Sequence, residues 1–200
     1  MASSSGSPTL PVIVITGQSG AGKGTLIKRL LEQFPQLELA VSATTRAQRP
    51  GEEDGVHYYF ISAEEFDRRL AAGEFLEYHE FSWGQRSGTL VSEIERVARD
   101  GKVCVLELET EGALTVGDRV PEAVTIFVTA PLPELQRRLW ERATESAGEI
   151  GERLEVAREQ LAVADRFDHV IENRDLDAAS AELAGIVGGL LAPAATMPRR

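Results

Sequence analysis

The stretch Gly17–Thr25, GQSGAGKGT, combines glycines and a lysine in an order that can bind phosphate. It follows the apolar run Pro11–Thr16 and precedes an amphipathic segment, which predicts a turn between a strand and a helix. Such a turn can aim successive backbone N–H groups at a phosphate, and Lys23 adds a positive charge for the outer phosphates. An ordinary strand–helix turn is the alternative, and the matching flanks favour a triphosphate site. Its predicted residues are Gly17, Gln18, Ser19, Gly20, Ala21, Gly22, Lys23, Gly24 and Thr25.

The hydroxyl of this loop comes one position late. A serine or threonine directly after the lysine usually ligates Mg²⁺, but here that residue is Gly24 and the hydroxyl belongs to Thr25. We therefore expect Mg²⁺ to be held mainly by phosphates and water, with no certain direct protein ligand. Thr25 and Glu107 are the candidates for a contact with the ion.

A second candidate anion site lies in Ser42–Asp54, SATTRAQRPGEED. Arg46 and Arg49 are three residues apart among hydroxyl side chains, so they could fork around another phosphate. The alternative is a pair of solvated loop arginines. The spacing alone leaves both readings open.

The elements that must position these residues alternate along the chain. Apolar runs predict buried strands at Pro11–Thr16, Lys102–Leu108, Val124–Thr129 and Phe167–Ile171. Amphipathic segments predict helices at Gly24–Phe34, Thr89–Asp100, Glu111–Arg119, Pro133–Arg142, Gly148–Arg166 and Asp177–Leu191. Strands that are apolar throughout and alternate with helices indicate an α/β fold, in which helices cover both faces of a parallel sheet.

The stretch 40–89 breaks this alternation and predicts a small mixed α+β insertion. It is rich in turn residues and carries strand-like stretches at His57–Ile61 and Glu74–Phe81 around a short helix, Ala63–Ala72. We expect it at the carboxyl end of the sheet, where α/β proteins bind ligands. The core would then comprise residues 10–39 and 90–191, between disordered ends at 1–9 and 192–200.

Composition excludes several classes of function. A net charge of −11 argues against broad binding to nucleic acid or anionic membrane. No apolar run approaches the roughly 18 residues of a membrane span, and the first residues lack the features of a signal peptide. A single cysteine, Cys104, rules out an internal disulfide, and the scattered histidines do not suggest zinc. We expect a cytoplasmic protein whose oligomeric state the sequence does not reveal.

From Val12 to Asn173 the chain resembles the guanylate kinase family. The family pattern S-x-T-T-R-x-x-R-x-G-E-x-x-G-x-x-Y-x-F is present as Ser42, Thr44, Thr45, Arg46, Arg49, Gly51, Glu52, Gly55, Tyr58 and Phe60. The resemblance implies a P-loop NTPase-type core, a GMP-binding insertion at 40–89 and a helical arginine-bearing lid at 137–157. It also implies ATP and GMP as small-molecule substrates.

The resemblance implies a role for each part of the acceptor site. Arg46, Arg49 and Tyr58 would grip the phosphate of GMP, while Ser42 and Glu77, helped by Thr89, would read the guanine. A carboxylate suits guanine because it can accept hydrogen bonds from N1–H and the exocyclic amine. Glu107 and Glu109 are expected on one face at the end of a strand, near the nucleotides and the water shell of the metal.

The family's lid pattern R-L-x-x-R-G-T-E-S begins at Arg138. By resemblance, Arg138, Arg142 and Arg153 would close over the triphosphate and stabilise charge on the transferring group. Lys23 and Arg46 complete the predicted catalytic cations, and Asn173 falls where the family contacts adenine.

Three positions depart from the family. Its tyrosine in G-N-x-Y-G-T is Ser87, its glutamine before glycine is Glu111, and its lid glycine is Ala143. Stacking by Trp83 or Arg86 could replace the contact of the lost aromatic ring.

These observations predict the transfer of the ATP γ-phosphoryl group to GMP and dGMP, giving ADP and GDP, in purine nucleotide metabolism. One alternative is a non-catalytic guanylate-kinase-like module that binds phosphopeptides, against which the intact Gly17–Lys23 loop argues. Another is a kinase of a phosphorylated sugar, against which Ser42 and Glu77 argue.

Overall fold

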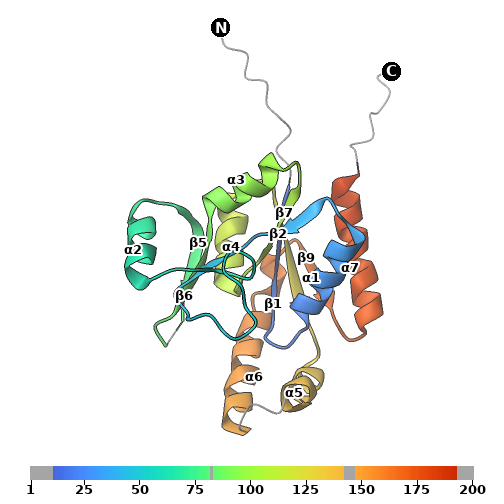
Figure 1. The fold of residues 1–200 in the computed structure, drawn as a ribbon. Helices are drawn as coiled ribbons and strands as arrows, with labels where there is room; N and C mark the ends of the chain where they lie inside the picture. Colours follow the sequence, from blue (N-terminus) through green and yellow to red (C-terminus); the bar gives the residue numbers. More distant parts are fainter. Residues whose placement is uncertain (1–10, 82, 142–146, 193–200) are drawn as a thin grey trace, which may run out of the picture.

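A computed structural model describes residues 11–81, 83–141 and 147–192 (Figure 1). The predicted disordered ends lie outside the described residues apart from Ala192, and so do Arg142 and Ala143 of the predicted lid. Among the described residues, no helix has the length and apolar character needed to cross a membrane.

Five parallel strands form the main sheet, in the order β2-β7-β1-β8-β9. They are β1 (Val12–Gly17), β2 (Leu37–Leu39), β7 (Val103–Glu107), β8 (Ala123–Thr129) and β9 (His169–Glu172). The central strand β1 is buried along its whole length and pairs with β7 on one side and β8 on the other. The glycine loop therefore leaves the carboxyl end of the central strand, as the sequence predicted.

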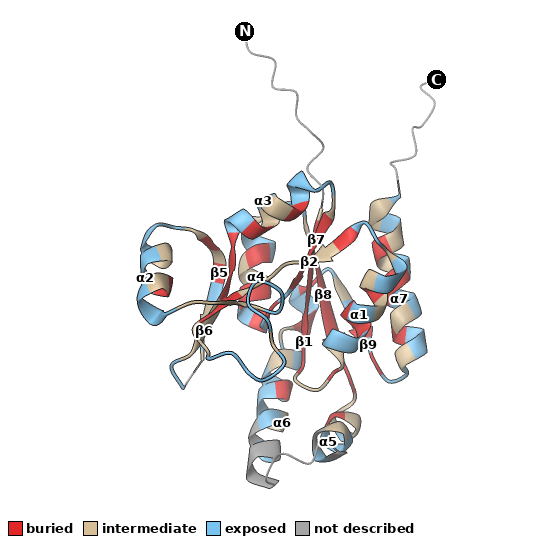
Figure 2. Ribbon diagram, viewed as in Figure 1, coloured by how far each residue is buried: buried red, intermediate tan, exposed pale blue. Residues whose placement is uncertain are grey.

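Helices cover both faces of this sheet (Figures 1 and 2). Alternate residues of β1 point to opposite faces, so Ile13 and Ile15 pack with α1 (Lys23–Gln33) and α7 (Leu176–Leu191). Val12 and Val14 face the other side, where α3 (Val91–Arg99) and α4 (Thr110–Arg119) contribute Val97, Ala113 and Val116. This confirms the predicted α/β architecture.

Two further helices, α5 (Leu132–Glu141) and α6 (Ala147–Leu161), lie beyond the carboxyl ends of the strands (Figure 1). Each is anchored by a buried residue, Leu135 on α5 and Ala157 on α6, that joins the core on the α1 side of the sheet. A single 3₁₀ turn, Ala164–Arg166, then leads to β9.

A separate mixed sheet with the strand order β4-β3-β6-β5 lies to the side of the core. Its elements are β3 (Ala43–Thr44), β4 (Tyr59–Phe60), α2 (Ala63–Ala71), β5 (Phe75–Glu80) and β6 (Arg86–Leu90). Phe66 of α2 is fully buried and stacks on Phe75 at 4.4 Å between ring centroids. Because it has its own small core, this unit can hold a rigid ligand-binding face.

Some predicted boundaries were wrong for identifiable reasons. The helix expected from Thr89 begins at Val91, because Thr89 pairs with Glu77 as part of β6. The strand expected from Phe167 begins at His169, and the helix expected to reach Arg166 ends at Leu161. The edge strand β2 was missed because three residues carry no periodic signal.

Glu93 of α3 fastens the mixed sheet to the core. Its side chain is only 3% exposed and accepts hydrogen bonds from the Val41 N–H (3.0 Å) and the Tyr59 hydroxyl (3.1 Å). Arg96 pairs with the same carboxylate at 2.7 Å. Burial acts to raise the pKa of Glu93, but the hydrogen bonds from Arg96, Val41 and Tyr59 outweigh it and the pKa lies below its usual value.

We predict that Glu93→Gln lowers the free energy of unfolding by about 1–3 kcal/mol at neutral pH, because Arg96 loses the most buried of its carboxylate partners and keeps only Glu38 and Asp100. Since the folded pKa of Glu93 is depressed, its contribution exists above the unfolded pKa and is lost as pH falls through the folded pKa. Urea unfolding at several pH values measures both effects. The exposed Glu95→Gln on the same helix is the control, and equal stabilities of the two variants would contradict the prediction.

Candidate active site

The glycine loop has the conformation of a phosphate cradle at the start of α1. Gly17 and Gly22 have φ angles of 138° and 91°, which other residues rarely adopt. A Cβ on Gly17 would lie 1.9 Å from the Val128 carbonyl oxygen, and one on Gly22 would lie 2.6 Å from Nδ2 of Asn173. The loop can therefore keep this shape only with glycine at both positions, and it leaves the first N–H groups of α1 available to an anion.

Lys23 lies at the first turn of α1 and points back over the loop. Its Nζ donates to the carbonyl oxygens of Gly17 (2.9 Å) and Gln18 (3.3 Å). Burial lowers the pKa of Lys23, while the negative charges of Glu107 and Glu109 act in the opposite direction. These two carboxylates therefore lie close enough to Lys23 to favour its charged form.

The glycine loop is anchored to the rest of the protein through the Ala21 carbonyl oxygen. It accepts hydrogen bonds from Nδ2 of Asn173 (2.7 Å) and from Nη1 of Arg138 (3.3 Å). Arg138 also donates to the Asn173 carbonyl oxygen at 2.9 Å. Two predicted ATP-site residues thus meet at the loop itself, and Oδ1 of Asn173 is a buried acceptor without a hydrogen-bond partner.

Glu107 and Glu109 lie on either side of the buried Leu108 at the end of β7. Glu107 is exposed to solvent as a whole residue, yet desolvation of its carboxyl group raises its pKa. The positive charge of Lys23 acts in the opposite direction. In the described ranges, no group of three or more His, Cys, Asp or Glu side chains could hold a metal ion. A metal at this edge would need ligands from outside the protein.

Arg46 is held by a carboxylate in the loop after β3. Its guanidinium forms two hydrogen bonds to Glu52, at 2.9 Å and 2.8 Å, and lies 5.3 Å from the centre of the Tyr58 ring. The Arg46 hydrogen bonds and the Arg49 N–H hold the pKa of Glu52 at about 2. The family pattern contains Glu52, but we predicted no role for it from the sequence. Its position six residues after an arginine in the same loop is compatible with an ion pair.

Glu77 of β5 is a buried carboxylate, with 6% exposure. Its Oε1 accepts a hydrogen bond from the Thr89 N–H on the paired strand β6 at 2.9 Å. Burial raises the pKa of Glu77 above its usual value, Thr89 opposes the rise, and the charge of Glu109 adds to it. The Thr89 side chain is buried beside this carboxylate and also acts to lower its pKa, so two residues predicted for the acceptor site share one polar recess.

The space for this carboxylate exists because α4 has a glycine opposite it. A Cβ on Gly112 would lie 2.4 Å from Oε2 of Glu77. Gly112 has an ordinary helical φ, so it is needed for space and not for backbone freedom. The sequence did not indicate this role of Gly112, because a glycine within a helix is recognisable only as a weak helix former.

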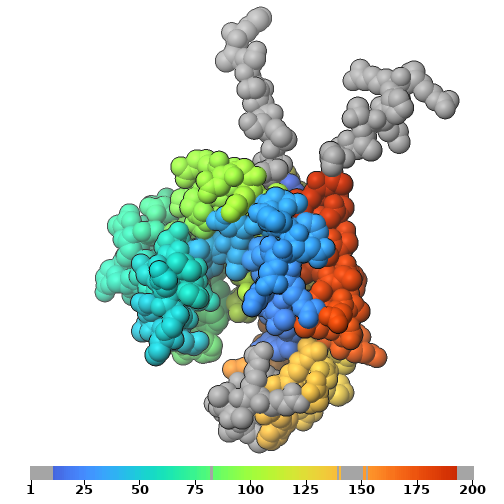
Figure 3. Space-filling model, turned by 45° about the vertical axis from the view of Figure 1, so that its right-hand side comes forward, coloured from blue at the N-terminus to red at the C-terminus, as the bar shows by residue number. Residues whose placement is uncertain are grey.

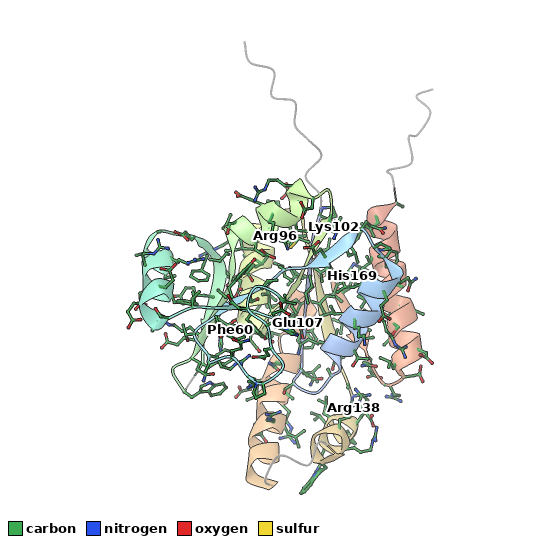
Figure 4. The ribbon with its side chains drawn as sticks, viewed as in Figure 1. Phe60, Arg96, Lys102, Glu107, Arg138 and His169 are labelled. Carbon is green, nitrogen blue, oxygen red and sulfur yellow. The ribbon has the colours of Figure 1, made fainter. Side chains whose placement is uncertain are left out.

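The residues predicted for the two nucleotide sites lie near one common charge. The charge of Glu109, at the start of α4, acts on both Lys23 and Glu77. Figure 3 shows the surface hollowed between the mixed sheet and α1, and Figure 4 places Glu107 there and Arg138 on α5 nearby. A separate open groove of about 370 Å³ runs along α1 and is lined by residues of α1, β2 and β7, among them Gly24 and Glu107.

The remaining predicted residues lie around this hollow or outside the described part. Ser42 is half-buried, and its carbonyl oxygen accepts from the Tyr59 N–H. Arg49 in its loop and Arg153 on α6 are exposed, and Arg142 lies outside the described residues. Thr25 is exposed on the first turn of α1.

At the position of the family tyrosine, Ser87 and the nearby Arg86 and Trp83 each contact other groups of the protein. Ser87 donates from its hydroxyl to the Ala43 carbonyl oxygen at 3.1 Å. Arg86 pairs with Asp67 and lies over the Phe66 ring at 4.6 Å, on the α2 side of the sheet, so it does not replace the tyrosine. Trp83 stacks on Phe81 at 4.9 Å, and this pair continues the row of Glu77 and His79 along β5.

Comparison with known proteins gives a consistent result. The family model described as guanylate kinase matches residues 10–189. The chain is 46% identical over 182 residues to a guanylate kinase of Rubrobacter xylanophilus, covering 90% of this chain and 95% of the relative. It is 45% identical over 177 residues to one from Symbiobacterium thermophilum, covering 88% and 83%. A crystal structure of guanylate kinase from Anaplasma phagocytophilum superposes with a TM-score of 0.71 at 28% identity, covering 90% and 85%.

We predict that Gly112→Ala displaces the Glu77 carboxylate and raises the KM for the guanine nucleotide about tenfold, as expected for misplacing one buried acceptor. Alanine favours helix by about 1 kcal/mol over glycine, so the variant should not be less stable. Steady-state kinetics and thermal unfolding together measure the two effects.

The matched control is Gly185→Ala on α7, where a Cβ would meet nothing within 4 Å. It should raise the melting temperature and leave the KM unchanged. An unaltered KM in Gly112→Ala would show that this glycine does not reserve space for the reading of guanine.

Proposed function

This chain belongs to the guanylate kinase family and catalyses the ATP-dependent phosphorylation of GMP in purine metabolism, and we propose how its residues divide the work. We assign the donor site to the glycine loop, the acceptor site to the mixed sheet and the loop before it, and the cover to α5 and α6. The observation that carries this assignment is the buried Glu77 carboxylate, one helix away from Lys23.

In the donor site, N–H groups at the start of α1, together with Lys23, hold the β- and γ-phosphates of ATP, whereas the N–H groups of Gln18, Ser19 and Ala21 are bonded within the protein. In the free protein Lys23 donates to the carbonyl oxygens of Gly17 and Gln18, so a phosphate takes the place of weak neutral acceptors. Charge-assisted hydrogen bonds to phosphate are about twice as strong as neutral ones. ATP binding therefore turns Lys23 outward with a net gain.

The donor set fits Mg²⁺ that is held by phosphates and water. The described residues lack a three-carboxylate cage, and Mg²⁺ retains several waters in such sites. Glu107 and Glu109 would accept hydrogen bonds from the waters of a bound ion, and Thr25, exposed on the first turn of α1, would offer a hydroxyl. When bound, Mg²⁺ neutralises charge on the phosphates.

In the acceptor site, Arg46 and Arg49 bind the phosphate of GMP, together with the Tyr58 hydroxyl. Glu52 keeps the guanidinium of Arg46 extended beside Tyr58 before any nucleotide arrives. A pre-positioned arginine loses less side-chain freedom on binding, so Glu52 lowers the entropic cost of forming the site.

Glu77 reads the base, with Thr89 and Ser42 beside it. A carboxylate accepts from guanine N1–H and from its exocyclic amine, and adenine offers an acceptor where guanine has N1–H. Binding adenine would leave the buried Glu77 unpaired, a penalty of about 1–3 kcal/mol. The buried hydroxyl of Thr89, beside Glu77, gives the base a further polar contact.

The cover consists of Arg138, Arg142 and Arg153, which neutralise charge on the transferring phosphoryl group. Arg138 already contacts the loop at Ala21, so it lies within reach of the phosphates. Asn173 has a free buried acceptor, Oδ1, that suits the exocyclic amine of adenine. These roles are carried over from the family onto the matching residues of this chain.

The chemical step needs little more than positioning. An oxygen of the GMP phosphate attacks the γ-phosphorus of ATP in line, a new P–O bond forms, and the bond to the β-phosphate oxygen breaks to release ADP. The acceptor oxygen is already ionised at neutral pH, so no side chain must remove its proton. Excluding water from the hollow prevents transfer to water instead of GMP.

We also propose a reducing compartment, the cytoplasm, as the place of this reaction. Cys104 is buried in β7, and burial raises the pKa of its thiol to about 12. A thiol with that pKa is unreactive at neutral pH, which fits a structural residue.

An acceptor panel tests this assignment. With ATP and Mg²⁺ present, we expect phosphorylation of GMP to exceed that of AMP and ribose phosphates by about 100-fold or more in kcat/KM. Lys23→Ala should reduce turnover of every acceptor by about 1000-fold. Equal use of AMP, or turnover that survives in Lys23→Ala, would contradict the assignment.

We predict that the KM for GMP rises as the pH is lowered from neutrality towards the usual glutamate pKa, because the raised pKa of Glu77 means that its acceptor form is lost earlier than for an ordinary glutamate. In Glu77→Gln this part of the pH dependence should vanish, with kcat/KM for GMP lowered about 100-fold.

A raised acid pKa costs stability once pH exceeds the unfolded value, so Glu77→Gln should unfold at a higher temperature than the wild type at neutral pH. Parallel pH profiles of wild type and variant, measured with GMP limiting, decide the kinetic part. Identical profiles would mean that Glu77 does not contact the base.

A further inference from the structure

Gln18 lies inside the glycine loop but its side chain points away from the phosphate side. It is fully buried, one of the largest side chains in the molecule with no exposed surface. A buried primary amide must have its donors and acceptors satisfied by protein groups, so its partners reveal what it holds. The proposed donor site assigns no task to this amide.

The amide joins two segments that are far apart in the chain. Its Oε1 accepts from the Thr129 hydroxyl at 2.6 Å and from the Ala130 N–H at 3.0 Å, at the end of β8. Its Nε2 donates to the Ala157 carbonyl oxygen of α6 at 2.8 Å. The side chain thus spans from the sheet to the helix that carries Arg153.

The main chain of Gln18 is equally occupied. Its N–H donates to the Val128 carbonyl oxygen at 3.1 Å, and its own carbonyl oxygen accepts from Nζ of Lys23 at 3.3 Å. Any rotation of this peptide would therefore move the resting position of Lys23. Next to it, the Ser19 N–H donates to Oε1 of Gln160, also on α6, at 3.3 Å.

Arg153 lies one helical turn before Ala157 on α6. Because both residues belong to the same helix, a hydrogen bond that fixes the Ala157 carbonyl group also fixes the position of Arg153 relative to the loop. Catalysis of phosphoryl transfer depends on such relative positions, and small misplacements cost large factors in rate.

We infer that Gln18 is a positioning residue, which locks α6 to the glycine loop so that Lys23 and Arg153 keep a fixed separation during transfer. The inference rests on the proposed donor site. Gln18 was predicted as a triphosphate-site residue, but its side chain and N–H are bonded within the protein, so it acts through Lys23 and α6. Because Gln18 also accepts hydrogen bonds from Thr129 and Ala130, the positions of Lys23 and α6 are both tied to the end of β8.

The competing account is that Gln18 only fills space under the loop. Gln18→Met separates the two accounts because methionine has a similar length and volume but cannot form these hydrogen bonds. If Gln18 positions the catalytic cations, kcat falls about tenfold while the KM for GMP changes less than about twofold. A space-filling role alone would be preserved by methionine and would leave both constants at their wild-type values.

Gln18→Glu provides a rescue by pH. Its protonated acid can donate to the Ala157 carbonyl oxygen, whereas its carboxylate cannot, and burial favours the acid. The ratio of its kcat to the wild-type kcat should rise as pH falls, while the ratio for Gln18→Met stays flat. Lys23, beside the Gln18 carbonyl group, is present in both proteins, so its own titration is common to variant and wild type and cancels in the ratio.

Two variants outside the loop serve as matched controls. Gln160→Met removes the hydrogen bond between α6 and the Ser19 N–H, and should lower kcat in the same direction as Gln18→Met. Thr129→Val removes one donor to Oε1 but leaves the contact to α6, and should lower kcat less than about threefold. If Gln18→Met does not fold, Gln160→Met and the pH profile of Gln18→Glu decide.

The inference is overturned if the variants at Gln18 and Gln160 turn over ATP and GMP like the wild type at every pH. That result would leave the proposed function intact, because the wild-type enzyme would still form GDP. Absence of GDP formation in the wild type would instead overturn the proposed function.

Discussion

The phosphate loop must leave its N–H groups and Lys23 open to the ligand, so it has to be held entirely from behind. Four segments that are distant from the loop in sequence meet this demand. Asn173 and Arg138 bind the Ala21 carbonyl oxygen, and the Gln18 side chain ties the loop to β8 and α6. The parallel sheet makes this possible, because it brings the ends of β1, β8 and β9 to one edge.

The acceptor site depends on a buried negative charge that the protein keeps at a cost. Glu77 has one N–H partner, from Thr89, and its pKa is raised by burial and by Glu109. A buried carboxylate with an incomplete set of donors is unstable by itself but well prepared for a ligand that supplies them. Guanine supplies two donors, so the cost in the free protein becomes selectivity in the complex. Gly112 reserves the space for this arrangement.

The sequence predicted the architecture because the buried strands and the glycine loop are local patterns, and the family motifs placed Arg46, Tyr58 and Glu77 within them. It missed what depends on contacts across the chain. Gln18 reads as one more loop residue until Ala157 and Thr129 are brought against it. Glu93 and Gly112 carry no local signal, because their roles exist only where α3 and α4 meet the mixed sheet. Strand pairing likewise overrode the helical pattern at Thr89.

The central claim is that donor and acceptor sites share one hollow, separated only by the start of α4. A bisubstrate compound that links adenosine and guanosine through five phosphates measures this directly by titration calorimetry. Because the second half binds at millimolar effective concentration, we expect its Kd to be at least about 100-fold below that of ATP or GMP. Lys23→Ala and Glu77→Gln should each remove most of that gain. A Kd no lower than that of ATP alone, or one unchanged by Glu77→Gln, would contradict the account.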